Sequence, residues 1–178
     1  ASNTLNDVDG LGEISYQWLA DGQAISGATQ DTYTLTQADV GKSIELTATY
    51  VDLQGTTEAV TSSATSAVQN INDAPTGQVT LSGTAAQGET LSASNTLNDV
   101  DGLGEISYQW FADGQAISGA TQDTYTLALK DVGRQINVGA EFTDEEGTLE
   151  SVTSRQTAAI KHVNTPPEGS VSIQGSPI

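Results

Sequence analysis

The sequence contains no cysteine and no methionine, and it is poor in basic residues. Without cysteine, no disulfide can hold the fold, and thiol-based metal or redox chemistry is excluded. Lys and Arg together number 5 against 23 Asp and Glu, which gives a formal net charge of −18 over 178 residues. This balance argues against nucleic acid as a partner, because phosphate binding depends on Lys and Arg. It also disfavours anionic membrane surfaces, which attract basic segments.

Long apolar runs are missing as well. No stretch approaches the roughly 18 apolar residues of a membrane-spanning helix, so we expect no membrane insertion. The excess of carboxylates has two interpretations, which stay open for any single residue: solubility in a salty medium, or oxygen ligands for a hard cation. A secreted protein without cysteine avoids oxidative cross-linking during export, which fits an extracellular location.

The strongest feature that is present is an internal repeat. The second copy follows the first at a spacing of 92 residues without gaps, and residues 1–35 differ from residues 93–127 only at Leu19 and Phe111. From Thr36 onward the copies diverge, but apolar positions remain apolar. Each copy has about the size of an immunoglobulin-type sandwich. Tandem arrays need length, whereas an enzyme rarely needs two copies of one site, so the repeat favours a structural role.

Strands are predicted by alternation of apolar and polar residues. Ile14, Tyr16 and Trp18 alternate with polar neighbours, and a longer alternating run extends over residues 44–50. Asp21-Gly22 follows the first run as a hairpin-turn pair. Tyr33 and Leu35 alternate next and are expected to lie in a strand before the longer run. No helical periodicity is present, so we predict an all-β fold of tandem immunoglobulin-like β-sandwiches with about seven strands each. Alternation places Trp18 and its second copy, Trp110, in the cores of the two sandwiches rather than on a sugar-stacking surface.

Two long segments carry a resemblance to a known family. YQWLADGQAISGATQDTYTLTQADVGKSIELTATY and its second copy resemble bacterial immunoglobulin-like repeats. The whole unit, including QNINDAPTGQVTLSGTAAQGETLSASNTLNDVDG, is similar to the tandem cadherin-like repeats of large RTX-type bacterial surface adhesins. The resemblance implies a structural extender repeat of a secreted or cell-surface adhesin in cell adhesion and biofilms. It also implies Ca²⁺-stiffened junctions, with neighbouring repeats of the same protein as partners.

The expected domain boundaries follow the repeat. Residues 1–71 form an immunoglobulin-like repeat that lacks its first strand, and residues 76–162 form a complete one. Residues 163–178 supply a linker and the first strand of a third repeat. The cadherin-like linker of the resemblance is the segment Asn70–Pro75.

Acidic loops in each copy suggest a calcium site beside this linker. In a sandwich, the B–C and F–G loops lie at the same end as the N-terminus. We therefore expect the linker and both loops of the second copy to converge on one Ca²⁺, with these ligands: Asn72, Asp73, Asp99, Asp101 and Asp144. The first copy keeps Asp7, Asp9 and Asp52 without a matching linker, so its site is expected to be empty or weak.

Two further observations limit the calcium hypothesis. The DVDG loop also fits a simple polar turn, and Asn72-Asp73 fits a turn before Pro75. No LDRE-like acidic motif precedes the linker, where Asp39 stands alone, so we expect one ion per junction rather than three. The third linker, residues 161–167, has lost the Asp and gained a Lys, which disfavours calcium there.

Catalysis finds little support. The only histidine, His162, lies in an expected linker, and a Ser–His–Asp arrangement needs a positioned base. Asp99 and Asp101 are two residues apart in a loop without the groove that a glycosidase requires. We expect no enzyme. The alternative function is a carbohydrate- or ligand-binding module of a secreted protein, and no residue here excludes an accessory domain of a secreted enzyme.

The repeat register also suggests strand exchange. Ala1 aligns with Ala93 inside the second strand of the sandwich, and residues 169–175 align with residues 77–83, its first strand. An open sheet edge invites pairing. We therefore expect Val171 and Ile173 of one molecule to fill the vacant place in the first domain of another copy.

Overall fold

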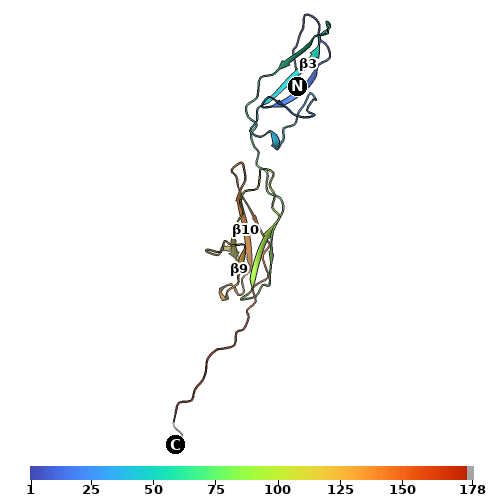
Figure 1. Cartoon of the computed structure of the whole chain (residues 1–178). Coiled ribbons are helices and arrows are strands. Elements are labelled where there is room, and N and C mark those ends of the chain that lie inside the picture. Colours follow the sequence, from blue (N-terminus) through green and yellow to red (C-terminus); the bar gives the residue numbers. More distant parts are fainter. Residues whose placement is uncertain (176–178) are drawn as a thin grey trace. The chain divides into compact units, whose positions relative to one another are not determined.

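The computed structural model describes residues 1–175, and the chain divides into two compact units (Figure 1). Unit 1 comprises Ala1–Asn72, and unit 2 begins at Asp73. The two units correspond to the two copies of the repeat. None of the helices in the described part of the chain is long and apolar enough to cross a membrane.

Unit 2 is an antiparallel sandwich of two sheets. One sheet has the strand order β11-β10-β7-β8 and the other has the order β5-β6-β9. The strands and the one short 3₁₀ helix are β5 (Val79–Ser82), β6 (Thr90–Asn95), β7 (Ser107–Ala112), β8 (Gln115–Ala116), β9 (Thr124–Thr126), η2 (Leu129–Asp131), β10 (Ile136–Thr143) and β11 (Leu149–Thr153). These seven strands confirm the predicted all-β, immunoglobulin-like fold class.

The core of unit 2 lies between the two sheets. Trp110 on β7 is fully buried, pairs in register with Val138 on β10, and packs against Tyr125 of the other sheet with ring centroids 5.6 Å apart. Val79 and Leu91 bring apolar side chains from β5 and β6 to the same cluster. The prediction that Trp110 is a core residue is confirmed.

Unit 1 has a single four-stranded sheet, with the order β2-β1-β3-β4. Its elements are β1 (Ser15–Ala20), β2 (Gln23–Ala24), η1 (Gln37–Asp39), β3 (Ile44–Val51) and β4 (Thr57–Thr61). This sheet matches β7, β8, β10 and β11 of unit 2 strand for strand. In both units, the predicted hairpin turn is confirmed, because Asp21 and Asp113 have φ angles of 47° and 48° and a glycine with positive φ follows each.

The structure differs from the sequence-based expectation around Tyr33 and Leu35, which form no strand in unit 1. The matching segment of unit 2, β9, pairs with Thr90–Ser92 of β6. Within residues 1–175, no strand pairs with Tyr33 or Leu35 of unit 1. As a result, Trp18 is only half-buried, and Leu35 is 51% exposed.

Candidate cation site

The acidic loop of each copy is a tight turn built by its own aspartates. In unit 2, Asp99 Oδ1 accepts a hydrogen bond of 2.9 Å from the Asp101 backbone N–H. In unit 1, Asp7 Oδ1 accepts the same bond from the Asp9 N–H at 2.8 Å. An aspartate that binds the backbone two residues onward is the usual way in which a short polar side chain fixes a turn. The polar-turn interpretation of DVDG is therefore correct for one oxygen of Asp99, and it leaves the other oxygen free for a second role.

The loop of unit 2 is fastened to the hairpin between β10 and β11. The backbone N–H of Glu145 donates to the Asp101 carbonyl at 3.1 Å. Gly104 comes so close to β10 that an added Cβ would lie 2.0 Å from the Thr143 carbonyl oxygen. Asp144, at the start of this hairpin turn, accepts a 2.7 Å hydrogen bond from the Thr148 N–H through Oδ1. Asp101 and the Asp144 turn are thus held side by side by backbone contacts.

The segment that enters unit 2 also contacts this loop. The Asp73 N–H donates a 2.6 Å hydrogen bond to Asp101 Oδ2. Thr76 and Asn98 exchange two backbone hydrogen bonds, of 2.8 and 3.1 Å, in an isolated antiparallel bridge. The expected approach of the linker to the DVDG loop is therefore present from Asp73 onward. Asn72 is the last residue of unit 1, and the structure does not place it relative to the loops of unit 2.

Three carboxylates of this region are buried, and each has one oxygen without a hydrogen-bond partner. Asp99, Asp101 and Asp144 are only 7%, 3% and 5% exposed. The unpartnered atoms are Asp99 Oδ2, Asp101 Oδ1 and Asp144 Oδ2. A buried anionic oxygen without a donor is costly, so each such atom needs an explanation. Within residues 1–175, no group of three or more His, Cys, Asp or Glu side chains is already arranged to hold a metal ion.

The equivalent carboxylates of unit 1 have different surroundings. Tyr50 Oη donates a 2.8 Å hydrogen bond to Asp7 Oδ2. This hydrogen bond, together with burial, raises the pKa of Tyr50 above its ordinary value. Asp52 is buried and accepts two backbone hydrogen bonds through Oδ1, and Asp9 is exposed. None of these three aspartates has a buried oxygen without a partner.

One substitution accounts for the difference at the first aspartate. The position of Tyr50 is occupied in unit 2 by Phe142, which is buried and has no hydroxyl. Asp99 Oδ2 therefore lacks the donor that Asp7 Oδ2 has. Sequence reasoning missed this because it treated the pair as a conserved apolar position. The signal was available, since the hydroxyl is the only chemical difference between the two side chains.

Asp39 is the one acidic residue near the place where an LDRE-like motif would precede the linker. It has a structural role in unit 1. Its Oδ2 accepts hydrogen bonds from the Tyr33 hydroxyl, the Thr36 N–H and the Thr36 hydroxyl at 2.8–3.0 Å. Burial alone would raise the pKa of Asp39, but these hydrogen bonds outweigh it and hold the pKa below the ordinary value. The carboxylate caps η1 and does not join the acidic loops.

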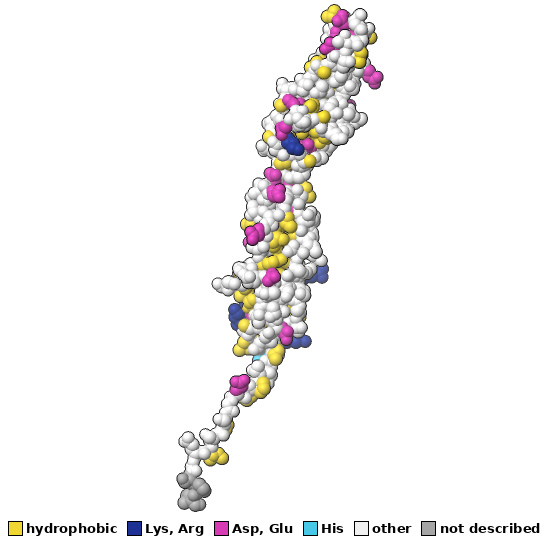
Figure 2. All heavy atoms as spheres, in the orientation of Figure 1, with side chains coloured by type: hydrophobic (Ala, Val, Ile, Leu, Met, Phe, Trp, Pro, Cys, Tyr) yellow, Lys and Arg dark blue, Asp and Glu magenta, His cyan; other side chains and the backbone are white. Residues whose placement is uncertain are grey.

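The surface charge agrees with the composition. Figure 2 shows acidic side chains spread over the visible face of both units, with few basic ones between them. Within the part of the chain that the structure describes, one ion pair is formed, between Arg134 Nε and Asp113 Oδ2 at 3.0 Å. Asp113 lies in the turn between β7 and β8 and Arg134 precedes β10. Among the described residues, no basic side chain forms an ion pair with Asp99, Asp101 or Asp144.

No protein-family model matches the chain, and no curated protein matches it. Among solved structures, the chain is similar to the fibronectin(III)-like modules of Clostridium thermocellum CbhA, at 20% sequence identity and a TM-score of 0.33. That match covers 95% of this chain and 88% of the other.

Proposed function

We propose that this chain is a structural, non-catalytic repeat segment of a large secreted or cell-surface adhesin, and that its second repeat binds one Ca²⁺. Two near-identical repeats in tandem support an extender role, because length is what such an array adds. The observation that carries the calcium proposal is the set of three buried, unpartnered carboxylate oxygens on Asp99, Asp101 and Asp144.

The chemistry of these oxygens favours calcium. Ca²⁺ takes six to eight oxygen ligands at about 2.3–2.6 Å and tolerates irregular geometry, whereas Mg²⁺ demands a near-ideal octahedron. The three aspartates come from two loops, and backbone contacts through Asp101 and Glu145 hold these loops together. Small rotations of the carboxylates would turn their free oxygens toward one ion, with backbone carbonyls and water completing the shell. Their mutual repulsion without an ion favours the same result.

The proposed effect of the ion is to stiffen the segment that enters unit 2. Asp101 already accepts the Asp73 N–H through one oxygen and would bind calcium through the other. Extracellular modules bind calcium with a Kd of about 10⁻⁴–10⁻³ M. A tenfold excess of calcium over Kd would then stabilise the folded state by about 1.4 kcal/mol. The main consequence is therefore orientational, because a fixed entry segment makes an array of repeats extend.

The alternative of a carbohydrate-binding module has no observation in its favour. A sugar-stacking surface needs exposed aromatic rings, and every Trp, Tyr and Phe of the chain is buried or partly buried. Screening on a glycan array with and without Ca²⁺ separates the two proposals. Saturable glycan binding at millimolar affinity or better would favour the module over the extender.

The test of the extender proposal compares matched positions of the two repeats. Thermal melting and small-angle scattering are measured in CaCl₂ and in EDTA for the parent chain, Asp101→Asn and Asp9→Asn. We expect calcium to raise the melting temperature and the maximum dimension of the parent and of Asp9→Asn, but not of Asp101→Asn. Equal behaviour of the parent in calcium and EDTA would overturn the proposal.

A further inference from the structure

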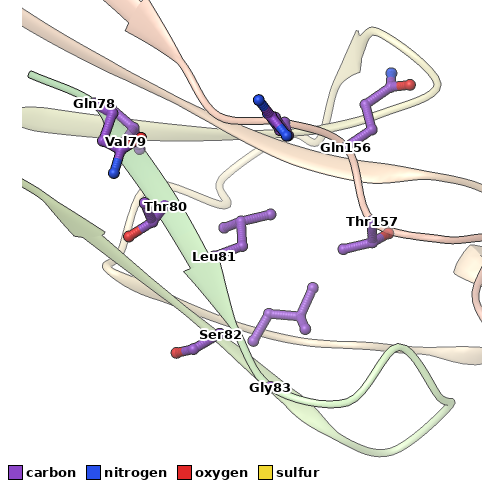
Figure 3. A pocket seen from close by; sticks show the side chains of 10 residues that line it. Gln78, Val79, Thr80, Leu81, Ser82, Gly83, Gln156 and Thr157 are labelled. Atoms are coloured by element: carbon purple, nitrogen blue, oxygen red, sulfur yellow. The ribbon is translucent and has the colours of Figure 1, made fainter.

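One edge of unit 2 is open between β5 and residues 155–157, where a cavity of about 290 Å³ lies (Figure 3). Its lining includes Leu91, which is a core residue, and Leu81, which packs against the core. Figure 3 shows Leu81 pointing from β5 to the side of Thr157, while Thr80 points to the opposite side of the strand. The cavity therefore reaches the apolar interior between the two sheets.

The cavity marks the place where two strand edges separate. Beyond β5, after Gly83, the chain joins the segment that follows β11. The Lys161 N–H donates to the Ala85 carbonyl at 3.0 Å, and the Gln87 N–H donates to the Lys161 carbonyl at 2.9 Å. Between β5 itself and residues 155–157, no backbone hydrogen bond is formed in the described structure. The sandwich is thus closed at Lys161 and open beside β5.

The free edge of β5 presents backbone groups to a further strand. β5 lies at the end of its sheet and pairs with β6 alone among the described strands. The Thr96 N–H donates to the Gln78 carbonyl at 3.0 Å, so Gln78 belongs to a hydrogen-bonded pair. Hydrogen-bonded and non-hydrogen-bonded pairs alternate along an antiparallel ladder, so the N–H and C=O groups of Val79 and Leu81 point away from β6. A row of such groups is a template for another strand.

The charge at the cavity is unusual for this chain. None of the lining residues is acidic, and Arg155 is the basic one. Arg155 is exposed, and within residues 1–175 its guanidinium forms no ion pair or hydrogen bond. The matching position of unit 1 is Ser63. The nearby Thr65 of unit 1 and Thr157 of unit 2 each accept a 3.0 Å hydrogen bond from a strand N–H, so the local backbone contact is common to both copies. The second copy has therefore gained an unpaired cation on the same local structure.

We propose that this cavity binds an extended peptide segment of a partner protein, in which apolar residues alternate with a carboxylate. The peptide backbone pairs with the free edge of β5, which is strand addition to an exposed sheet edge. Side chains alternate along a strand, so the apolar ones face Leu81 and the carboxylate faces outward, where Arg155 is exposed. This surface adds a binding role to the extender role and does not depend on calcium.

A peptide is the occupant that uses all three features of the cavity. A small anion would use Arg155 and leave the backbone edge of β5 and the apolar lining without a role. A purely apolar ligand would use Leu81 and Leu91 and leave the guanidinium without a role. An acidic and apolar strand satisfies the edge, the lining and the cation together, because a guanidinium can bind a carboxylate through two parallel hydrogen bonds.

Titration of peptides into the ¹⁵N-labelled 178-residue chain tests the proposal. The probe is the capped pentapeptide TVEVT, and TVQVT is its neutral control. EDTA is present, so calcium cannot bridge the peptide glutamate and the acidic loops. We expect saturable binding of TVEVT, slower hydrogen exchange at the Val79 and Leu81 amides, and about tenfold weaker binding of TVQVT. No saturable binding of TVEVT at up to about 5 mM, or equal affinity for the two peptides, would overturn the proposal.

Two substitutions of exposed basic residues separate the site from net charge. Arg155→Ser introduces the side chain that unit 1 has at this position and should weaken TVEVT binding about tenfold. Lys130→Ser removes the same charge from an exposed residue that does not line the cavity, so it should bind as the parent does. Equal weakening by both variants would contradict the proposal. Protection of the Val79 and Leu81 amides that rises with protein concentration in the absence of peptide would assign the edge to a second copy of the chain and overturn it.

Discussion

The Tyr50 hydroxyl donates a 2.8 Å hydrogen bond to Asp7 Oδ2, across 43 residues of sequence. In the second copy Phe142 replaces this tyrosine, and the matching oxygen of Asp99 is buried without a partner. A hydroxyl and a cation are alternative ways to satisfy the same oxygen. The first copy uses the hydroxyl, and we propose that the second copy uses the ion.

Phe142→Tyr should give Asp99 Oδ2 the hydroxyl donor that Asp7 Oδ2 has in unit 1, in place of the proposed ion. Unit 1 shows that the fold accommodates the larger ring, because Tyr50 is itself buried. In EDTA, the new hydrogen bond to a carboxylate should stabilise unit 2 by about 1.5–3 kcal/mol. The same bond should weaken calcium binding, because it occupies Asp99 Oδ2. Denaturant unfolding in EDTA and calcium titration measure the two effects.

The reciprocal variant is the matched control for this exchange. Tyr50→Phe removes the donor to Asp7 in unit 1 and leaves the loops of unit 2 untouched. It should destabilise unit 1 without changing calcium affinity. If Tyr50→Phe weakened calcium binding as much as Phe142→Tyr did, the ion would not be confined to unit 2.

The two tryptophans should differ in their contribution to stability although their local sequences are nearly identical. Each indole Nε1 donates to a backbone carbonyl, at 2.9 Å for Trp18 and 2.8 Å for Trp110, so the hydrogen bond is common to both. Burial is not common, because Trp110 is fully buried and Trp18 is partly exposed. Trp110→Ala should cost unit 2 about 3–5 kcal/mol.

Trp18→Ala should cost unit 1 roughly half of that or less, because less apolar surface is lost from the core. Urea unfolding of each variant against the parent gives both values. Equal costs for the two substitutions would contradict the difference in burial between Trp18 and Trp110.

Gly104→Ala should loosen the acidic loop from β10. The added Cβ would meet the Thr143 carbonyl oxygen at 2.0 Å, so the loop or the strand must move. We expect a loss of about 1–3 kcal/mol in the stability of unit 2. Gly175→Ala is the control, because an added Cβ there meets nothing within 4 Å. Equal stability of the two variants would contradict the close contact.

Tyr125 should make the stability of unit 2 sensitive to strong alkali. Burial, the hydrogen bond to Asp131 and the charge of Asp131 raise the pKa of Tyr125 from 10.0 to about 12. A pKa that is raised on folding stabilises the fold below the unfolded value, and this stabilisation is lost as the pH rises through about 12. Absorbance titration of tyrosinate should show a late step that is absent in Tyr125→Phe. An unchanged titration curve would assign the step to another tyrosine.

Much of the fold could be predicted from the sequence, because the two copies of the repeat align without gaps and show the same strand and turn patterns. The alternation around Trp110 and the Asp21-Gly22 turn depend on neighbours in sequence, and the structure confirms both. The approach of Asp73 to Asp101 followed from sandwich topology alone. These features need only the order and direction of the strands.

What could not be predicted depends on partners that are distant in sequence. Trp18 has the same neighbours as Trp110, but its burial depends on strands that cover it from the other sheet. The partner of Asp7 lies on β3, and whether its hydroxyl reaches the carboxylate depends on side-chain geometry. Asp39 is indistinguishable in sequence from a possible ligand until its hydrogen bonds to Tyr33 and Thr36 are known.

The most direct test of the calcium proposal is isothermal titration of CaCl₂ into the calcium-free chain, with Asp101→Asn and Asp9→Asn beside it. We expect one ion per chain with a Kd of about 10⁻⁴–10⁻³ M. Asp9→Asn should keep this binding, and Asp101→Asn should lose it. Absence of binding to the parent, or two equal sites per chain of which each variant removes one, would contradict a single calcium site in the second repeat.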